Sequence, residues 1–190
     1  MVDMPDEALL RYAQREVRET QLRAFITASN LIEGIEEAWI RPAELAAYDE
    51  LLEAEEIDPP LLTRFVAAVQ PGAVLRYKPR EPGHDTVIAD RRTGALIFRP
   101  PPSGPEVARA LLEWLSCLNN AKIKRTPAEA HFEFETLHPF TDGNGRAGRA
   151  LWLWQLEREG GNPLAGLPFL HRWYYESLTL ARSLEKEADA

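Results

Sequence analysis

Prolines and glycines divide this chain of 190 residues into segments, and this division constrains the fold more than any other feature. Proline lacks a backbone donor and glycine is entropically costly inside regular elements, so helices tend to begin or end at these residues. Between them, apolar residues recur at helical spacing, which predicts a mainly α-helical protein. We expect one or two helices over residues 5–31, and further helices over 42–54, 60–69, 105–118, 127–137, 145–159 and 168–185.

One stretch, residues 71–103, differs in being rich in proline and in β-forming residues. Two short β-forming runs flank Arg92-Thr93-Gly94, which predicts a β-hairpin from about Thr86 to Phe98. Three prolines follow the hairpin, and Ser103 is expected to cap the next helix. The whole chain, residues 1–190, is therefore predicted to be a single helical domain with one small hairpin.

Composition excludes several classes of function. The net charge of −8 argues against broad nucleic-acid binding, which needs a basic surface to displace phosphate counterions. No run of residues approaches the ~18 apolar positions of a membrane span, and the N-terminus lacks the basic and apolar parts of a signal peptide. The single cysteine, Cys117, excludes an intrachain disulfide. We expect a cytoplasmic protein that binds neither nucleic acid nor membrane.

The segment His138–Arg149 gathers a histidine, a carboxylate, three glycines, an amide and two arginines at a predicted helix start. Gly143 and Gly145 let backbone amides approach phosphate oxygens at a helix N-terminus, where unpaired donors and the helix dipole already favour anions. The Asn144 side chain can add a further donor. This collection of residues suits a polyphosphate.

Three other features of the segment fit the same ligand. Arg146 and Arg149 are three residues apart, so they share one face of a helix and can grip consecutive phosphates. Asp142 supplies a hard oxygen ligand for Mg²⁺, which typically binds through one or two carboxylates and substrate phosphates. His138 can take a proton from an attacking hydroxyl, because histidine ordinarily titrates near neutrality.

The segment also satisfies the dinucleotide pattern G-x-G-x-x-G over residues 143–148. A dinucleotide site needs a strand immediately before the glycines, whereas here a predicted helix and a His-Pro-Phe turn precede them. The P-loop pattern is absent from the chain. The phosphate site is therefore expected to be of another kind.

Residues 138–149 match every defined position of H-P-F-x-[DE]-G-N-G-R-x-x-R, and the chain thereby resembles Fic proteins. The preceding helix and the hairpin with its three prolines resemble the same family, so that the resemblance covers most of the chain. It implies a mainly α Fic fold, a helical bundle in which residues 84–102 form a flap that positions the target and residues 138–149 form the catalytic loop.

The resemblance also implies a role for each site residue. His138 would be the general base for a target hydroxyl, Asp142 would hold Mg²⁺ between the α- and β-phosphates of ATP, and Phe140 would anchor the loop in the core. The nucleotide-binding residues would be Gly143, Asn144 and Gly145, which form an anion nest, Arg146, which steadies the phosphates, and Arg149, which binds the γ-phosphate.

A second match lies in residues 1–37, which are predicted to hold N-terminal helices. Ser29-Asn30-Leu31-Ile32-Glu33-Gly34 fits the inhibitory pattern [ST]-x-x-x-E-[GN] of the N-terminally inhibited Fic class. By that resemblance Glu33 would pair with Arg149 and withdraw it from the γ-phosphate. Gly34 is independently expected to end the first helix, and a glutamate before such a glycine is also common on protein surfaces.

The sequence thus predicts a protein adenylyltransferase (AMPylator) that moves AMP from ATP to a Ser, Thr or Tyr hydroxyl of an unknown target protein. The target would dock on the flap by strand addition, and Glu33 would inhibit the transfer of AMP. Two alternatives are a hydrolase that uses Glu33 to remove AMP from a modified protein, and a non-catalytic nucleotide-binding module. A kinase-like Doc relative is disfavoured because Gly145 is intact. Self-association as a homo-oligomer is left open.

Overall fold

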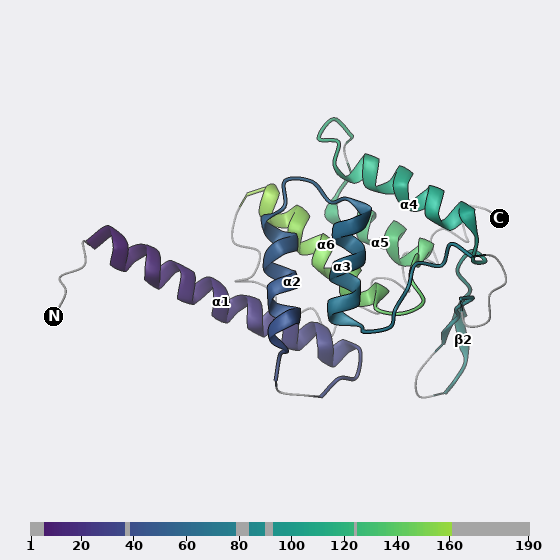
Figure 1. The fold of residues 1–190 in the computed structure, drawn as a ribbon, viewed down its shortest axis with the longest axis horizontal. Helices are drawn as coiled ribbons and strands as arrows, with labels where there is room; N and C mark the ends of the chain where they lie inside the picture. Colours follow the sequence, from purple (N-terminus) through teal and green to yellow (C-terminus); the bar gives the residue numbers. More distant parts are fainter. Residues whose placement is uncertain (1–5, 37–38, 79–83, 90–92, 124, 161–190) are drawn as a thin grey trace. The chain divides into compact units, whose positions relative to one another are not determined.

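The computed structural model describes residues 6–36, 39–78, 84–89, 93–123 and 125–160. It confirms a mostly helical protein with a small two-stranded antiparallel hairpin (Figure 1). The predicted helix over residues 168–185 lies outside the described residues. In chain order the elements are α1 (Asp6–Ile32), α2 (Pro42–Glu53), α3 (Pro59–Val69), β1 (Ile88–Ala89), β2 (Leu96–Phe98), α4 (Pro105–Leu118), α5 (Pro127–Leu137) and α6 (Asn144–Arg158).

The chain divides into two compact units, residues 1–41 with 160–190 and residues 42–159. The expectation of one domain over residues 1–190 stays a prediction. In the first unit, α1 is a single helix, and it ends in a Schellman motif: Ile35 N donates to Asn30 O at 3.0 Å and Gly34 N to Leu31 O at 2.9 Å. Gly34 has the positive φ of 71° that this motif needs, which confirms it as the residue that ends the helix.

In the second unit, α6 is the central helix. It packs against α2, α3 and α5, and α4 packs against α5 (Figure 1). Nine residues of α6 are buried, on all of its sides, as expected for a helix surrounded by others. The core of this unit includes two aromatic pairs, Tyr48 with Phe65 and Trp114 with Phe134.

Local sequence signals set the boundaries of the helices in this unit. Asp58 precedes α3, and its Oδ1 accepts a hydrogen bond from Leu61 N at 2.7 Å. Thr126 and Glu129 form a capping box at the start of α5, and Pro127 takes the first helical position, where its missing N–H is no loss. Within the described residues no helix is both long and apolar enough to cross a membrane.

The hairpin lies within the range predicted for it, Thr86 to Phe98. β1 pairs antiparallel with β2 in a register of Ile88 with Phe98 and Ala89 with Leu96, and part of the turn between them lies outside the described residues. The prediction that Ser103 caps α4 is wrong, because the N-cap is Gly104 and has no side-chain cap bond. Ser103 instead is buried and its N–H donates to Oδ1 of Asp85 at 2.7 Å, so it belongs to the base of the hairpin.

Candidate nucleotide-binding site

The turn between α5 and α6 begins at His138. This residue ends α5, as predicted from the proline that follows it, and its N–H donates to Phe134 O at 2.9 Å. Its φ of 48° and ψ of 59° are left-handed, and it is the only residue other than glycine with a positive φ in the described part of the chain. Such a conformation costs about 1–3 kcal/mol and persists only where surrounding structure enforces it. His138 itself is half-buried.

Two residues fix the shape of this turn from within. Phe140 is fully buried, in agreement with its expected role as the anchor of the loop. Asn144, which is also buried, accepts from Phe140 N at 2.9 Å through Oδ1 and donates from Nδ2 to Phe140 O at 2.8 Å. The structure thus uses the Asn144 amide to close the turn on itself, while direct contact of Asn144 with a nucleotide stays a prediction.

A short extended segment, Val74–Arg76, supports the same turn from outside. Leu75 forms an isolated antiparallel bridge with Phe140, in which Arg76 N donates to Pro139 O and Thr141 N donates to Val74 O, both at 2.9 Å. No local sequence signal predicted this pairing, because the segment was assigned only to a proline-rich stretch.

The other side of the same segment reaches the hairpin. Arg76 is fully buried, and its guanidinium donates to Pro101 O at 2.7 Å and 3.1 Å and to Oγ1 of Thr86 at 3.2 Å. Burial lowers the pKa of Arg76, and the nearby charge of Asp85 opposes that shift. Arg76 therefore joins the base of the flap to the turn that carries His138.

The turn ends at the N-terminus of α6. Gly143 is its N-cap, in a left-handed conformation with φ of 75°, and no side chain caps the first turn of the helix. A Cβ at Gly143 would lie 2.9 Å from Cβ of Gln70, so both backbone conformation and space require glycine here. The backbone N–H groups of this first turn therefore lack a side-chain cap, which is the arrangement that favours anions at helix N-termini.

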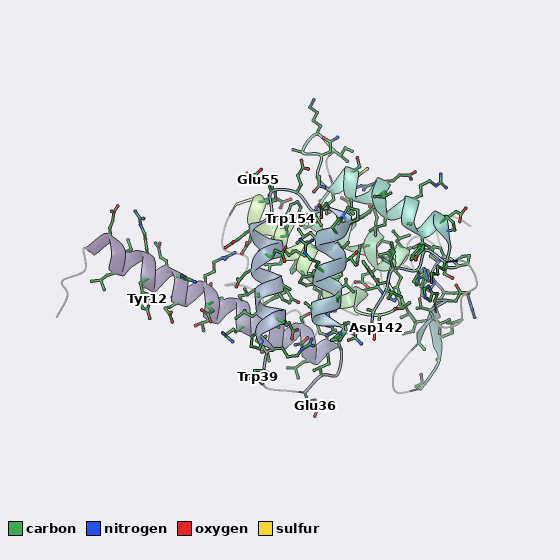
Figure 2. The ribbon with its side chains drawn as sticks, viewed as in Figure 1. Tyr12, Glu36, Trp39, Glu55, Asp142 and Trp154 are labelled. Atoms are coloured by element: carbon green, nitrogen blue, oxygen red, sulfur yellow. The ribbon has the colours of Figure 1, made fainter. Side chains whose placement is uncertain are left out.

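Asp142 and Arg146 lie on either side of this N-cap and share one neighbour. Asp142 is exposed, near the C-terminal end of α3 (Figure 2), and its Oδ1 accepts from Gly143 N at 2.6 Å. Its Oδ2 accepts from Nε2 of Gln70 at 2.7 Å. Arg146 is buried and donates to Val69 O and to Oε1 of Gln70. Sequence reasoning missed Gln70, because its position before Pro71-Gly72 indicated only the end of a helix.

Arg149, one turn further along α6, has different neighbours. It is buried, and its positive charge acts on His131 of α5. Burial lowers the pKa of His131 to about 4, with Arg149 adding to the shift and a hydrogen bond with the Gly148 backbone opposing it. Arg146 is thus held at the end of α3, and Arg149 lies by α5. That both arginines bind the same polyphosphate stays a prediction.

Of the inhibitory motif, Ser29 is buried near the end of α1, and Glu33 is half-buried and occupies the position just before the helix-ending Gly34. Glu33 belongs to the first unit and Arg149 to the second. The inhibitory pairing of these two residues stays a prediction.

The fold and the turn together define a class of protein. Residues 67–156 match the Fic/DOC family. A solved Fic family protein from Desulfovibrio desulfuricans G20 has the same fold. The structural match covers 94% of this chain and 64% of that protein's chain, with a TM-score of 0.56 and 22% sequence identity.

Two related proteins are named protein adenylyltransferases. A probable protein adenylyltransferase of Aquifex aeolicus (strain VF5) is 39% identical over 59 residues, which are 30% of this chain and 18% of the relative. The protein adenylyltransferase fic-1 of Caenorhabditis elegans is 37% identical over 99 residues, which are 48% of this chain and 19% of the relative. The matched segments thus span less than a fifth of each of these relatives.

Proposed function

We propose that this Fic domain is a protein adenylyltransferase that moves AMP from ATP to a Ser, Thr or Tyr hydroxyl of a target protein. One observation carries the proposal: a single short turn has His138 at its start and an uncapped helix N-terminus, flanked by Asp142 and Arg146, at its end. The names of the two relatives support the same reaction.

In this reaction His138 takes the proton from the target hydroxyl. The hydroxyl oxygen forms a bond to the α-phosphorus of ATP, the bond from that phosphorus to the bridging oxygen breaks, and pyrophosphate leaves. The chain contributes mainly position and charge: backbone N–H groups of the first turn of α6 and the guanidinium of Arg146 face the phosphates, and Arg149 binds the γ-phosphate. His138 lies at the end of α5, where its backbone is held in a left-handed conformation.

Asp142 is the residue that would hold Mg²⁺. The fit is good, because Asp142 is exposed, both of its carboxylate oxygens are oriented by hydrogen bonds, and the phosphate-binding N-terminus of α6 is adjacent. No cluster of three or more carboxylate, histidine or cysteine ligands occurs in the described ranges, and a cation here would take its other ligands from phosphate and water. Bound Mg²⁺ would neutralise the charge that develops on the phosphate oxygens.

The hairpin is the proposed docking site for the target. It has only two strands, so each strand has an edge with backbone groups that can pair with an added strand. Val87, Leu96 and Ile97 are exposed and can contact the side chains of the added segment. The hydrogen bonds of Arg76 position the flap relative to His138.

We further propose that Glu33 inhibits the transfer by pairing with Arg149. The Schellman motif at the end of α1 fixes the backbone on both sides of Glu33, so its carboxylate projects from a defined position. A carboxylate beside Arg149 removes that guanidinium from the γ-phosphate and repels the phosphate directly.

The experiment is auto-modification with labelled ATP and Mg²⁺. We expect Glu33→Gly to raise label incorporation at least tenfold over the unmodified sequence, because Arg149 is released. The double variant Glu33→Gly with His138→Ala should incorporate none, and Glu36→Gly, which changes an exposed glutamate three residues further on, serves as the matched control.

Other outcomes separate the alternatives. Absence of label on Glu33→Gly would contradict transfer. If the unmodified sequence instead releases AMP from an AMPylated protein and Glu33→Gly does not, the hydrolytic function is correct. Tight ATP binding without turnover in either form would indicate a non-catalytic module.

A further inference from the structure

Gln70 occupies the junction between α3 and the nucleotide-binding turn. It ends α3 with non-helical φ and ψ of −134° and 87°, and its backbone remains anchored, since its N–H donates to Val66 O at 2.8 Å and its carbonyl accepts from Ala73 N at 3.1 Å. Its side chain is half-buried and packs so closely on the turn that only glycine fits at position 143.

The two ends of the Gln70 amide have different partners. Nε2 donates to Oδ2 of Asp142 at 2.7 Å, and Oε1 accepts from Nη2 of Arg146. An amide donates only through nitrogen and accepts only through oxygen, so these partners fix its orientation. Turned over, it would place its oxygen against the carboxylate and its N–H groups against the guanidinium. One side chain thus connects the carboxylate and the arginine on either side of the α6 N-cap.

We propose that Gln70 is a positioning residue of the nucleotide site, which holds Asp142 and Arg146 in the arrangement that a cation-bound phosphate requires. The inference rests on the proposed function. Carboxylates that bind metals are generally oriented by hydrogen bonds from outside the metal's own ligands, and loss of such a partner typically weakens metal affinity by about 10–100-fold. The guanidinium of Arg146 is fixed by the same amide together with Val69 O.

The exposure of Asp142 supports a role in positioning over one in folding. An exposed carboxylate can be satisfied by water, so its bond to Gln70 contributes little to holding α3 on α6. The contribution of the bond is orientation, because Nε2 of Gln70 and the N–H of Gly143 each hold one oxygen of the Asp142 carboxylate beside the N-cap of α6. Loss of the bond to Asp142 should therefore change cation binding far more than stability, whereas loss of the bond to the buried Arg146 also costs stability.

The test compares Gln70→Met with its parent in the Glu33→Gly background. Methionine keeps the length and packing of the side chain and removes both the donor and the acceptor. Calorimetric titration with the α,β-methylene analogue of ATP, which cannot release pyrophosphate, at a series of Mg²⁺ concentrations measures binding without transfer. We expect Gln70→Met to raise the Mg²⁺ concentration for half-maximal enhancement of binding by about 10–100-fold, and to lower the melting temperature because the buried Arg146 loses an acceptor.

Two further variants make the result specific. In the Asp142→Asn background the effect of Gln70→Met on Mg²⁺ dependence should disappear, since the amide acts through that carboxylate. Gln155→Met, at a half-buried glutamine near the far end of α6, should bind as the parent does. Unchanged Mg²⁺ dependence in Gln70→Met, or an equal effect with and without Asp142, would overturn the proposal. A parent that binds the analogue with Mg²⁺ but transfers no label from ATP would refute the proposed function alone.

Discussion

Gly148 shows how a single residue controls the approach of α5 to α6. A Cβ at this position would lie 2.4 Å from Oε1 of Glu135 and 2.9 Å from Cε1 of His131. Glu135 is itself buried, so neither neighbour on α5 can easily move into solvent. The absence of a side chain at position 148 therefore lets the helix that carries Arg149 pack directly on the helix that ends at His138.

Gly148→Ala tests this explanation through the sign of its effect. Helix propensity alone predicts that alanine stabilises α6 by about 0.8–1 kcal/mol. The steric conflict with Glu135 and His131 predicts destabilisation by about 1–3 kcal/mol, and we expect it to prevail. Chemical denaturation measures the difference, and a stabilised Gly148→Ala would show that α5 and α6 can separate at little cost.

His131 predicts a pH dependence of stability. Its folded pKa of about 4 lies below the ordinary histidine value of 6.5, because burial and the charge of Arg149 disfavour the protonated ring. The unfolded chain therefore binds the proton first as pH falls, so this contribution is fully present above pH 6.5 and is lost between pH 6.5 and about 4. It amounts to about 3 kcal/mol.

The measurement is the unfolding free energy as a function of pH for the unmodified sequence and for His131→Gln. Carboxylates titrate in the lower part of the same range in both proteins, so the difference between the two curves isolates the histidine. We expect the unmodified sequence to lose more stability between pH 6.5 and pH 4. Parallel curves would show that His131 is protonated as easily in the folded state as in the unfolded state.

At the scale of elements, the segment Val74–Arg76 joins the hairpin to the turn after His138. Its backbone pairs with the turn after His138, and the Arg76 side chain binds Pro101 O and Thr86 at the base of the hairpin. The carbonyl of Arg76 also accepts from Gly104 N at 3.0 Å, at the start of α4. The hairpin is thereby fixed at its base to the turn that begins at His138.

Arg76→Met should loosen the flap while keeping a long side chain in place. Without the guanidinium, Pro101 O loses its donor, which costs about 1–3 kcal/mol, and the hairpin loses its attachment. We expect amide hydrogen exchange in Leu96–Phe98 to quicken at least tenfold, with α5 and α6 little affected. Arg109→Met, at an exposed arginine paired only loosely with Glu113, is the control. Equal exchange in the two variants would contradict the role given to Arg76.

The elements themselves could largely be predicted from the sequence, because their ends depend on local signals. Prolines and glycines placed α2 to α5 within a residue or two, and the break after Leu137 followed from Pro139. Ser103 was assigned wrongly because a serine before a helix resembles a cap, whereas here Asp85 binds its N–H. The capping box of Thr126 and Glu129 was not predicted, although its spacing is that of the motif.

The supports of the candidate site could not be predicted in the same way. Gln70 lies 72 residues before Asp142, and Leu75 lies 65 residues before Phe140. Such contacts depend on how α3 packs on α6, which no local pattern encodes. Residues 138–149 were singled out because they are contiguous and chemically unusual, and their roles in a site stay predictions.

At the scale of the whole molecule, the proposed inhibition depends on one residue from each of the two units. The residue at the end of α1 that would inhibit, Glu33, and the arginine that it would engage, Arg149, are far apart in the sequence and belong to different units. A binding partner or self-association that keeps Glu33 from pairing with Arg149 would then activate transfer. The Glu33→Gly variant reproduces that state without a partner.

The central claim is that the turn after His138 directs attack at the α-phosphorus of ATP. The most direct test incubates Glu33→Gly and Mg²⁺ with ATP labelled at the α-phosphate and, in parallel, with ATP labelled at the γ-phosphate. The protein should retain the α-label, release the γ-label in pyrophosphate, and retain neither label when His138 is alanine. Retention of the γ-label, or an α-label that persists in the alanine variant, would contradict the central claim.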